Sequence, residues 1–171
     1  ATQRPSYSTI PPYSRYSTNH QRMHIELDSD TLFTAIKTVA HAVVNSPTTP
    51  ILENVLLRVT NERIVIAANN LEMAIEYTID TDIVVKEPGD ITISYRFLAS
   101  YLNLLDPTRL TIKTDTGNTL HFTANKNKMR HKGLSAEEFP MIPITRRDTR
   151  FVISSDILKR AFSKTLFSCA S

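Results

Sequence analysis

The side chains that most often carry catalysis are present in this chain, but without the spacing that catalysis requires. The five histidines show no metal-ligand spacing, and Cys169, the single cysteine, has no evident base. Only three glycines occur, and none forms a phosphate-binding loop. The carboxylate pairs Asp80/Asp82 and Glu137/Glu138 stand in turn-like contexts, where solvated charge is the simpler interpretation. We therefore expect no enzyme, no catalytic residue, no metal and no cofactor.

Basic side chains on predicted helix surfaces are the stronger chemical signal. Long, flexible cations attract phosphate groups without fixing a register, which is the sequence-independent part of nucleic-acid recognition. For each residue alone, an ordinary solvated cation is the alternative interpretation. The candidates on three predicted helices are Lys37, His41, Arg96, Lys159, Arg160 and Lys164.

The net charge of +3 does not by itself predict a polyanion partner. Three of the 20 Lys and Arg residues lie in residues 1–22, which contain no acid, and the 17 that remain equal the 17 Asp and Glu residues. Attraction to a polyanion would have to come from segregation of charge onto one face. The single cysteine excludes an internal disulfide framework and fits a reducing compartment. No apolar run is long enough to span a bilayer.

The elements that must position these cations alternate between strands and amphipathic helices. HIELD predicts a strand, and a helix capped by Asp28, Ser29 or Asp30 then continues to about Val44. A second helix is predicted from about Tyr95 to Leu105. Strands are predicted in ENVLLRVT, ERIVIAA, EMAIEYTID, DIVVK, DITIS, RLTIKTD, NTLHFTA and NKMRHKGL. This order predicts an α+β fold with two helices on one face of antiparallel sheets.

The two ends of the chain differ from this central body. The segment ATQRPSYSTIPPYSRYSTNHQR has one aliphatic side chain of any size, so we expect residues 1–22 to be a disordered extension. A transit peptide is the alternative interpretation. At the other end, RFVIS followed by Ser154 or Ser155 predicts a strand and a helix cap. The order strand, Ser-Asp, amphipathic helix occurs both at HIELDSD and at FVISSD, which indicates a weak internal repeat.

Several patterns follow one another from Met23 to Ser171: TTPILENVLL, NNLEM, the helix after ITISYRF, EEFP and the second strand-helix start. Their order and register resemble the start of the bacterial sliding clamp family, the beta subunit of the replicative DNA polymerase. The resemblance implies a first clamp domain at 23–143, a linker at 144–149 and the truncated start of a second domain at 150–171. It implies the DNA-clamp fold.

The resemblance also implies a function, namely a replication processivity factor that encircles duplex DNA. Two chains of three domains form a homodimer ring in that family, helices line the hole, and the polymerase III subunits and the clamp loader are partners. The location implied is the cytoplasm, in association with the nucleoid, without a membrane. The loop after the first helix would lie at the channel rim, where Ser46 replaces a basic residue that clamps often carry.

The run NKNKMRHK has two interpretations. The four cations of this run stand at alternate positions, with Met129 and His131 on the other strand face, so the run could be a charged edge strand that discourages pairing. The resemblance implies instead a subunit interface made by Lys126, Lys128 and Met129. A different class of function also remains open, a small non-enzymatic adaptor domain that binds proteins and never contacts DNA. We expect the last helix to be poorly docked.

Overall fold

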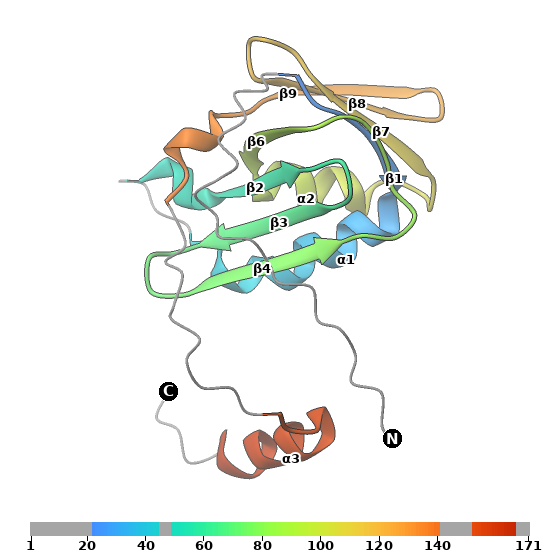
Figure 1. Ribbon diagram of the computed structural model, residues 1–171. Coiled ribbons are helices and arrows are strands. Elements are labelled where there is room, and N and C mark those ends of the chain that lie inside the picture. Colours follow the sequence, from blue (N-terminus) through green and yellow to red (C-terminus); the bar gives the residue numbers. More distant parts are fainter. Residues whose placement is uncertain (1–21, 45–48, 141–151, 167–171) are drawn as a thin grey trace.

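The computed structural model describes residues 22–44, 49–140 and 152–166. Apart from Arg22, the predicted disordered extension lies outside these residues, and so do Ser46 and Cys169. The described part contains two antiparallel sheets and three α-helices (Figure 1). The predicted α+β class with helices on antiparallel sheets is therefore confirmed.

The first sheet has five strands in the spatial order β5-β1-β7-β8-β9. Alternation decides its two faces: in β1, Ile25 and Leu27 are buried while His24 and Glu26 are only partly covered. Because side chains alternate across a strand, one face is apolar and packs inward, and the other is polar. The strands are β1 His24–Asp28, β5 Val84–Glu87, β7 Arg109–Thr114, β8 Thr119–Ala124 and β9 Asn127–Lys132.

The second sheet has four strands in the order β4-β3-β2-β6. In β2 every residue except Arg58 is buried, because both faces of this central strand are covered. Leu56 packs on the outer side with Ala67 and Phe139 in a small apolar cluster. The strands are β2 Asn54–Val59, β3 Ile64–Asn69, β4 Ala74–Ile79 and β6 Gly89–Ser94.

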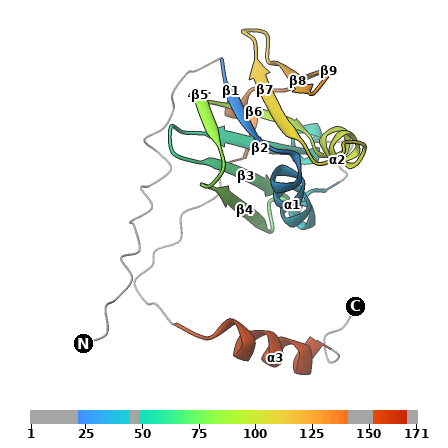
Figure 2. The same cartoon turned by 90° about the vertical axis from the view of Figure 1, so that its right-hand side faces the viewer.

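Two helices complete the core. They are α1, Ser29–Val39, and α2, Tyr95–Asn103, and they lie next to each other on the same side of the four-stranded sheet (Figures 1 and 2). One apolar core joins both helices to both sheets, with fully buried side chains such as Ile36, Ile66 and Phe122. The core therefore fixes the helices rigidly relative to the sheets.

The segment after β9 crosses to the second sheet and closes its β6 edge. Leu134 exchanges two backbone hydrogen bonds of 3.1 Å with Thr92 of β6. The buried Thr92 hydroxyl also donates to the Leu134 carbonyl (3.1 Å) and accepts from the Asn54 side-chain amide (3.2 Å). These pairings satisfy polar groups that would otherwise be buried without partners. Two short 3-10 helices complete this region: η3, Pro50–Glu53, directly precedes β2, and η4, Ala136–Glu138, follows Leu134.

The structure corrects two predictions at segment ends. The α-helical part of the first helix stops at Val39, not near Val44, and continues as the 3-10 helix η2, Ala40–Ala42. Its N-cap is Asp28, one of the three predicted residues, although the Asp28 side chain makes no cap hydrogen bond. Instead, the buried Ser29 hydroxyl accepts a hydrogen bond from the Thr108 backbone N–H (3.1 Å). The predicted strand RFVIS is also wrong where it can be checked, because residues 152–154 pair with no described strand, and a strand needs a neighbour for its backbone hydrogen bonds.

The third helix, α3, spans Ser155–Thr165 and buries none of its residues. Its apolar positions Ile157 and Phe162 are 52% and 58% exposed, and Leu166, just after the helix, is 63% exposed. This agrees with the expectation that the last helix is poorly docked. Its N-cap is Ser154, one of the two predicted serines.

Candidate nucleic-acid interface

Helix α1 turns one face to the core and presents the predicted cations on the other. Leu32, Ile36 and Val39 are buried, while Lys37 is exposed. The Lys37 ammonium lies 4.1 Å from the centre of the Phe33 ring, a cation–π contact that leaves the charge at the surface. Lys37 is thus held in place by its own helix and stays accessible to a ligand.

His41 is exposed, but it lies on the 3-10 turn η2 and not on the α-helix itself. The prediction that α1 continues past this residue was therefore wrong, while the expected exposure of the side chain is confirmed. A 3-10 turn commonly tightens the last turn of a helix, because it satisfies the free carbonyls there. His41 consequently stands at the C-terminal end of α1, where the helix dipole favours a cation.

Helix α2 supplies Arg96. The Ser94 hydroxyl caps this helix by accepting a hydrogen bond from the Phe97 backbone N–H (3.4 Å). Leu98 and Leu102 are buried, and Arg96 in the first turn is exposed, as predicted. A serine cap before the apolar stripe explains why the helix begins where the sequence predicts.

The packing of α1 against α2 brings two of the three predicted cation sets onto neighbouring elements. Lys37 and His41 come from α1 and η2, and Arg96 comes from α2, which contacts α1 directly. The only acid in α1 is Asp30 in its first turn, and α2 contains none. The helix surface therefore has a positive balance although the central body is neutral as a whole.

The structure does not join the third set to this surface. Lys159, Arg160 and Lys164 are exposed on α3, which makes no contact that buries a side chain. Residues 141–151, between η4 and α3, lie outside the described residues, as does Ser46. Of the predicted cations, the described residues place Lys37, His41 and Arg96 on neighbouring elements.

Strand β9 is the outer strand of the five-stranded sheet, which agrees with either interpretation of its cations. The structure corrects one detail: Lys126 lies in the turn before β9, after Asn125 at φ 53°, and does not share the strand face. Two-residue hairpin turns require such positive φ values. Asn125 and Lys126 therefore form the turn between β8 and β9, and β9 begins at Asn127. Lys128 is exposed within β9, and Met129 is 45% exposed.

An aromatic cluster that the sequence did not reveal joins β9 to helix α2. The His131 ring stacks on Phe97 with centroids 3.8 Å apart and planes 12° from parallel. Phe97 also stacks on Tyr101 at 6.2 Å, and Phe122 lies 5.2 Å from Tyr101. Burial lowers the pKa of His131 and raises the pKa of Tyr101, so both rings favour their neutral forms. Alternation in β9 indicated the inward side of His131, but not the helix it would meet.

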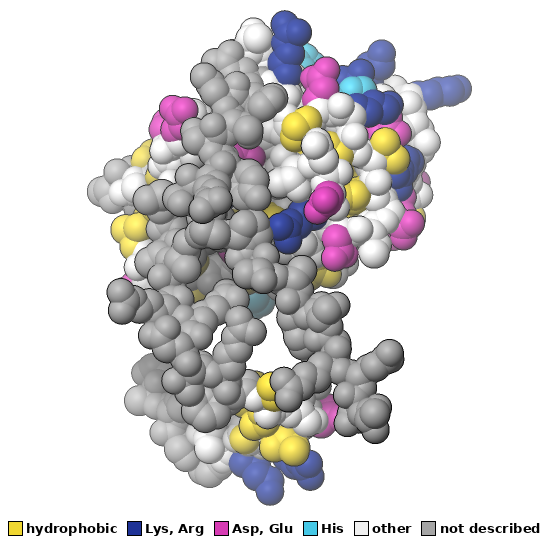
Figure 3. Space-filling view, in the orientation of Figure 1, with side chains coloured by type: hydrophobic (Ala, Val, Ile, Leu, Met, Phe, Trp, Pro, Cys, Tyr) yellow, Lys and Arg dark blue, Asp and Glu magenta, His cyan; other side chains and the backbone are white. Residues whose placement is uncertain are grey.

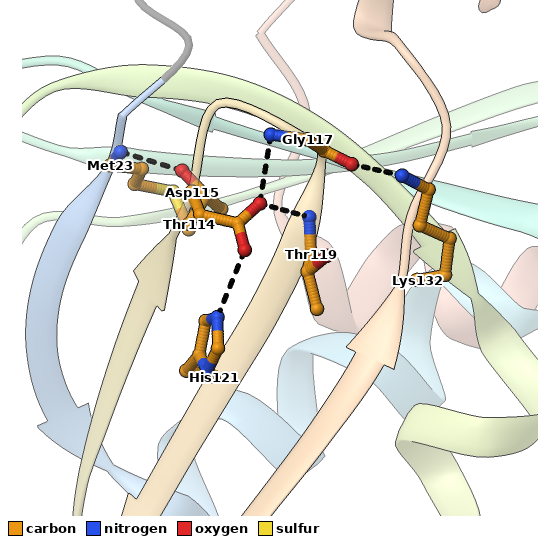
Figure 4. Close-up of polar contacts among 7 residues, drawn as sticks. All are labelled: Met23, Thr114, Asp115, Gly117, Thr119, His121 and Lys132. Atoms are coloured by element: carbon orange, nitrogen blue, oxygen red, sulfur yellow. Dashed lines mark hydrogen bonds and ion pairs between the residues drawn. The ribbon is translucent and has the colours of Figure 1, made fainter.

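The β7–β8 turn contains a second polar arrangement that sequence spacing did not single out (Figure 4). One carboxylate oxygen of Asp115 accepts hydrogen bonds from the backbone N–H groups of Thr119 (3.0 Å) and Gly117 (2.9 Å). The other oxygen lies 3.2 Å from Nε2 of His121. The bond from Thr119, and then those from His121 and Gly117, lower the pKa of Asp115 to about 2.

Replacement of Asp115 by Asn should make stability less dependent on pH in the acidic range. Because the folded pKa of Asp115 is depressed, its contribution is present above the unfolded pKa near 3.8 and is lost as the pH falls toward about 2. As the pH rises from about 2 to about 3.8, the natural chain should gain free energy of unfolding relative to Asp115→Asn. Urea unfolding at a series of pH values measures it, and a constant difference would contradict the assignment.

Two further findings limit the chemistry of the described residues. No group of three or more His, Cys, Asp or Glu side chains among them could hold a metal ion. No helix within the described ranges is both long and apolar enough to cross a membrane. Asp80, Asp82, Glu137 and Glu138 are all exposed, in agreement with their interpretation as solvated charge.

Residues 23–143 match the family described as the DNA polymerase III beta subunit, N-terminal domain. Curated relatives named beta sliding clamp include that of Streptococcus pneumoniae serotype 4, with 24% identity over 87% of this chain and 41% of the relative. The clamp of Chlamydia muridarum has 28% identity over 85% of this chain and 39% of the relative. The chain thus spans about two-fifths of the length of the curated relatives it matches.

Solved structures show the same fold. The beta chain of DNA polymerase III from Streptococcus pneumoniae superposes with a TM-score of 0.82 at 23% identity, over 87% of this chain and 41% of that one. The polymerase sliding clamp of Bacillus subtilis gives 0.81 at 22% identity, over 85% and 40%. The beta subunit from Pseudomonas aeruginosa gives 0.79 at 26% identity, over 87% and 40%. The clamp fold expected from the sequence is confirmed.

Proposed function

We propose, from the premise that this chain belongs to the DNA polymerase III beta subunit family, that it supplies part of a sliding clamp. The proposed activity is that of a processivity factor, which encircles duplex DNA and tethers the replicative polymerase. The names of its relatives support this proposal. Because the chain spans about two-fifths of their length, encirclement belongs to a protein of their full length.

The contact with DNA would be made by the helix surface of Lys37, His41 and Arg96. A clamp that slides needs attraction to phosphates without readout of bases. Exposed Lys and Arg side chains on rigid helices provide that attraction, and no ligand-fixing cavity is needed. The single observation that carries the proposal is the direct packing of α1 on α2, both with exposed cations and with Asp30 as their only acid. Lys159, Arg160 and Lys164 on α3, and Ser46, belong to the same proposal.

The domain organisation is also proposed from the family. Residues 23–143 would form the first clamp domain, residues 144–149 a linker and residues 150–171 the start of the second domain. The exposed apolar stripe of α3 supports this division, because burial of each large apolar side chain contributes about 1.5–3 kcal/mol that exposure forfeits. The remaining part of a second domain would cover it.

Assembly and partners follow in the same way. Lys126, Lys128 and Met129 would form the subunit interface of a homodimer ring, with Met129 in a small apolar contact. The position of β9 at the sheet edge and the 45% exposure of Met129 support this role. Polymerase III subunits and the clamp loader would bind the protein of full length, in the cytoplasm at the nucleoid. The role requires no catalysis.

The substitution Lys37→Gln with Arg96→Gln should weaken binding to duplex DNA and flatten its salt dependence. Non-specific binding to DNA has a dissociation constant of about 10⁻⁴–10⁻⁶ M, and a single domain should lie at the weak end. Each lost phosphate contact lowers the slope of log K against log salt by about 0.9, so the slope should fall by about 2. Fluorescence anisotropy with a labelled duplex, over a range of salt concentrations, measures both changes.

A matched control removes two cations from the sheet instead. Lys113→Gln with Arg130→Gln causes the same loss of net charge, but both residues lie on strands β7 and β9. This control should keep its affinity for duplex and its slope. If both double variants lose the same affinity, binding reflects net charge alone and the helix surface is not the DNA site. If neither does, the adaptor function becomes the better account.

A further inference from the structure

The polar face of the five-stranded sheet carries a line of basic residues that are directly opposite one another on neighbouring strands. His24 of β1 pairs with Lys113 of β7, Lys113 pairs with His121 of β8, and His121 pairs with Arg130 of β9. Residues directly opposite in an antiparallel pair lie on the same face. We call His24, Lys113, His121 and Arg130 the cross-strand row. In sequence these residues are far apart, so only the strand register reveals the row.

Three other cations on this face already have partners. Lys86 contacts the Glu26 carboxylate, the Arg109 guanidinium lies 3.5 Å from Asp28, and Lys132 donates to the Gly117 carbonyl. Among the described residues, no carboxylate lies within ion-pair distance of Lys113 or Arg130, the two permanent cations of the row. Both are exposed.

The row is therefore electrostatically incomplete. Like charges directly opposite on neighbouring strands destabilise a sheet, so three or four basic residues in direct register call for an anion. Both histidines of the row have a carboxylate partner, because Asp115 lies 3.2 Å from His121 and Glu26 lies 4.0 Å from His24, whereas Lys113 and Arg130 have none among the described residues. Burial is the main cause that lowers the pKa of His24; the charges of Lys113 and Lys86 lower it further, while Glu26 and Glu87 raise it. Lys, Arg and His side chains lie at the upper edge of the molecule, over β7, β8 and β9, with some Asp and Glu side chains between them (Figure 3).

The spacing of Lys113 and Arg130, the two permanent cations of the row, selects the ligand. Lys113 and Arg130 are two strands apart, which corresponds to about 9.6 Å across the sheet. Residues i and i+7 of an α-helix are about 10.5 Å apart along the axis and lie on one face. In an extended peptide, residues on one face repeat at about 6.8 Å and 13.6 Å, which fits less well. No Phe, Tyr or Trp stands in β7 or β9, and Phe122 of β8 is buried, so no aromatic platform for nucleic-acid bases exists here.

We propose that the outer face of β7, β8 and β9 docks an acidic helical segment of a protein partner, with carboxylates at positions i and i+7 paired to Lys113 and Arg130. The helix axis lies across the strands, along the cross-strand row. This surface is separate from the helix surface proposed for DNA, because the opposite face of the same strands packs on α2 through Phe122 and Phe97. A clamp domain would thus have one basic surface for phosphates and another for carboxylates.

The test uses two synthetic helical peptides of equal composition and charge. In the first, two Glu residues stand seven positions apart, and in the second they stand five apart, on different faces of the helix. At low salt the first peptide should bind the natural chain about fivefold to tenfold more tightly than it binds Lys113→Gln with Arg130→Gln. The second peptide should bind weakly to both proteins. Fluorescence anisotropy of labelled peptides measures these affinities.

The variant Lys37→Gln with Arg96→Gln is the matched control, because it loses the same charge from the helix surface. It should keep its affinity for the first peptide while its binding to duplex DNA weakens. Equal binding of the two peptides, or unchanged binding to Lys113→Gln with Arg130→Gln, would overturn the proposal. Tight binding of single-stranded DNA that these two substitutions abolish would assign the surface to nucleic acid instead. If the natural chain fails to bind duplex DNA but binds the first peptide as expected, the proposed clamp function is contradicted and the peptide-docking proposal stands.

Discussion

Phe122→Ala should lower the free energy of unfolding by about 3–5 kcal/mol. The side chain is 1% exposed and stands on the inner face of β8, where it meets the rings of Phe97 and Tyr101 of α2. Its ring lies 6.0 Å from Phe97 and 5.2 Å from Tyr101, tilted by 52° and 55°. Truncation removes this buried area and leaves a cavity that the surrounding sheet and helix cannot close.

Chemical unfolding by urea, followed by circular dichroism, measures this loss. Leu104→Ala is the matched control, because Leu104 follows the same helix α2 but is 83% exposed. A surface truncation of this kind should change stability by no more than about 0.5 kcal/mol. A loss below about 1 kcal/mol in Phe122→Ala would contradict the packing of β8 on α2.

Gly133→Ala should lower the free energy of unfolding by about 1–3 kcal/mol or more. A Cβ at this position would lie 2.4 Å from the Thr92 carbonyl oxygen, 2.9 Å from Leu120 and 3.0 Å from Ile91. The nearest atom belongs to the backbone, which cannot move aside as a flexible side chain can. Gly133 stands where the chain leaves β9 and joins β6, so relief of the clash would separate the two sheets.

Gly117→Ala tests whether the effect comes from this close approach and not from glycine itself. At Gly117 an added Cβ meets only Asp115 Oδ1 at 3.3 Å and Lys132 Nζ at 3.8 Å, both side-chain atoms. Its φ is not positive, so alanine fits the backbone there. Thermal unfolding of both variants should show a large fall for Gly133→Ala and a small change for Gly117→Ala. Equal changes would mean that the two sheets are not joined at Gly133.

Local patterns were sufficient to predict most elements of the fold. The stripe of Leu32, Ile36 and Val39 predicted α1, and the HIELD segment predicted β1. Errors arose where tertiary contacts decide the outcome. The serine predicted as a possible cap, Ser29, binds the backbone of Thr108, which is distant in sequence. The RFVIS pattern has strand-forming residues, but a strand exists only when a neighbour pairs with it.

The candidate sites differ in how far sequence could reach them. Lys37 and Arg96 could be placed on exposed helix faces from periodicity alone, but the contact between their helices, α1 and α2, belongs to the tertiary fold. The pairing of Lys113 with Arg130 through His121 depends on strand register, which no single-strand pattern contains. Stacking of His131 on Phe97 depends on both register and helix packing. Sequence therefore identified side chains, and the fold determined which of them act together.

The central claim is that duplex DNA meets the surface of α1 and α2. The most direct measurement is a nuclear magnetic resonance titration of the isotope-labelled chain with a short duplex, repeated with a second duplex of unrelated sequence. We predict shifts of the amide signals around Lys37, His41 and Arg96 with both duplexes, and unchanged signals on the outer face of β7, β8 and β9. Shifts that concentrate on that sheet face, or that appear with only one of the two duplexes, would contradict the account.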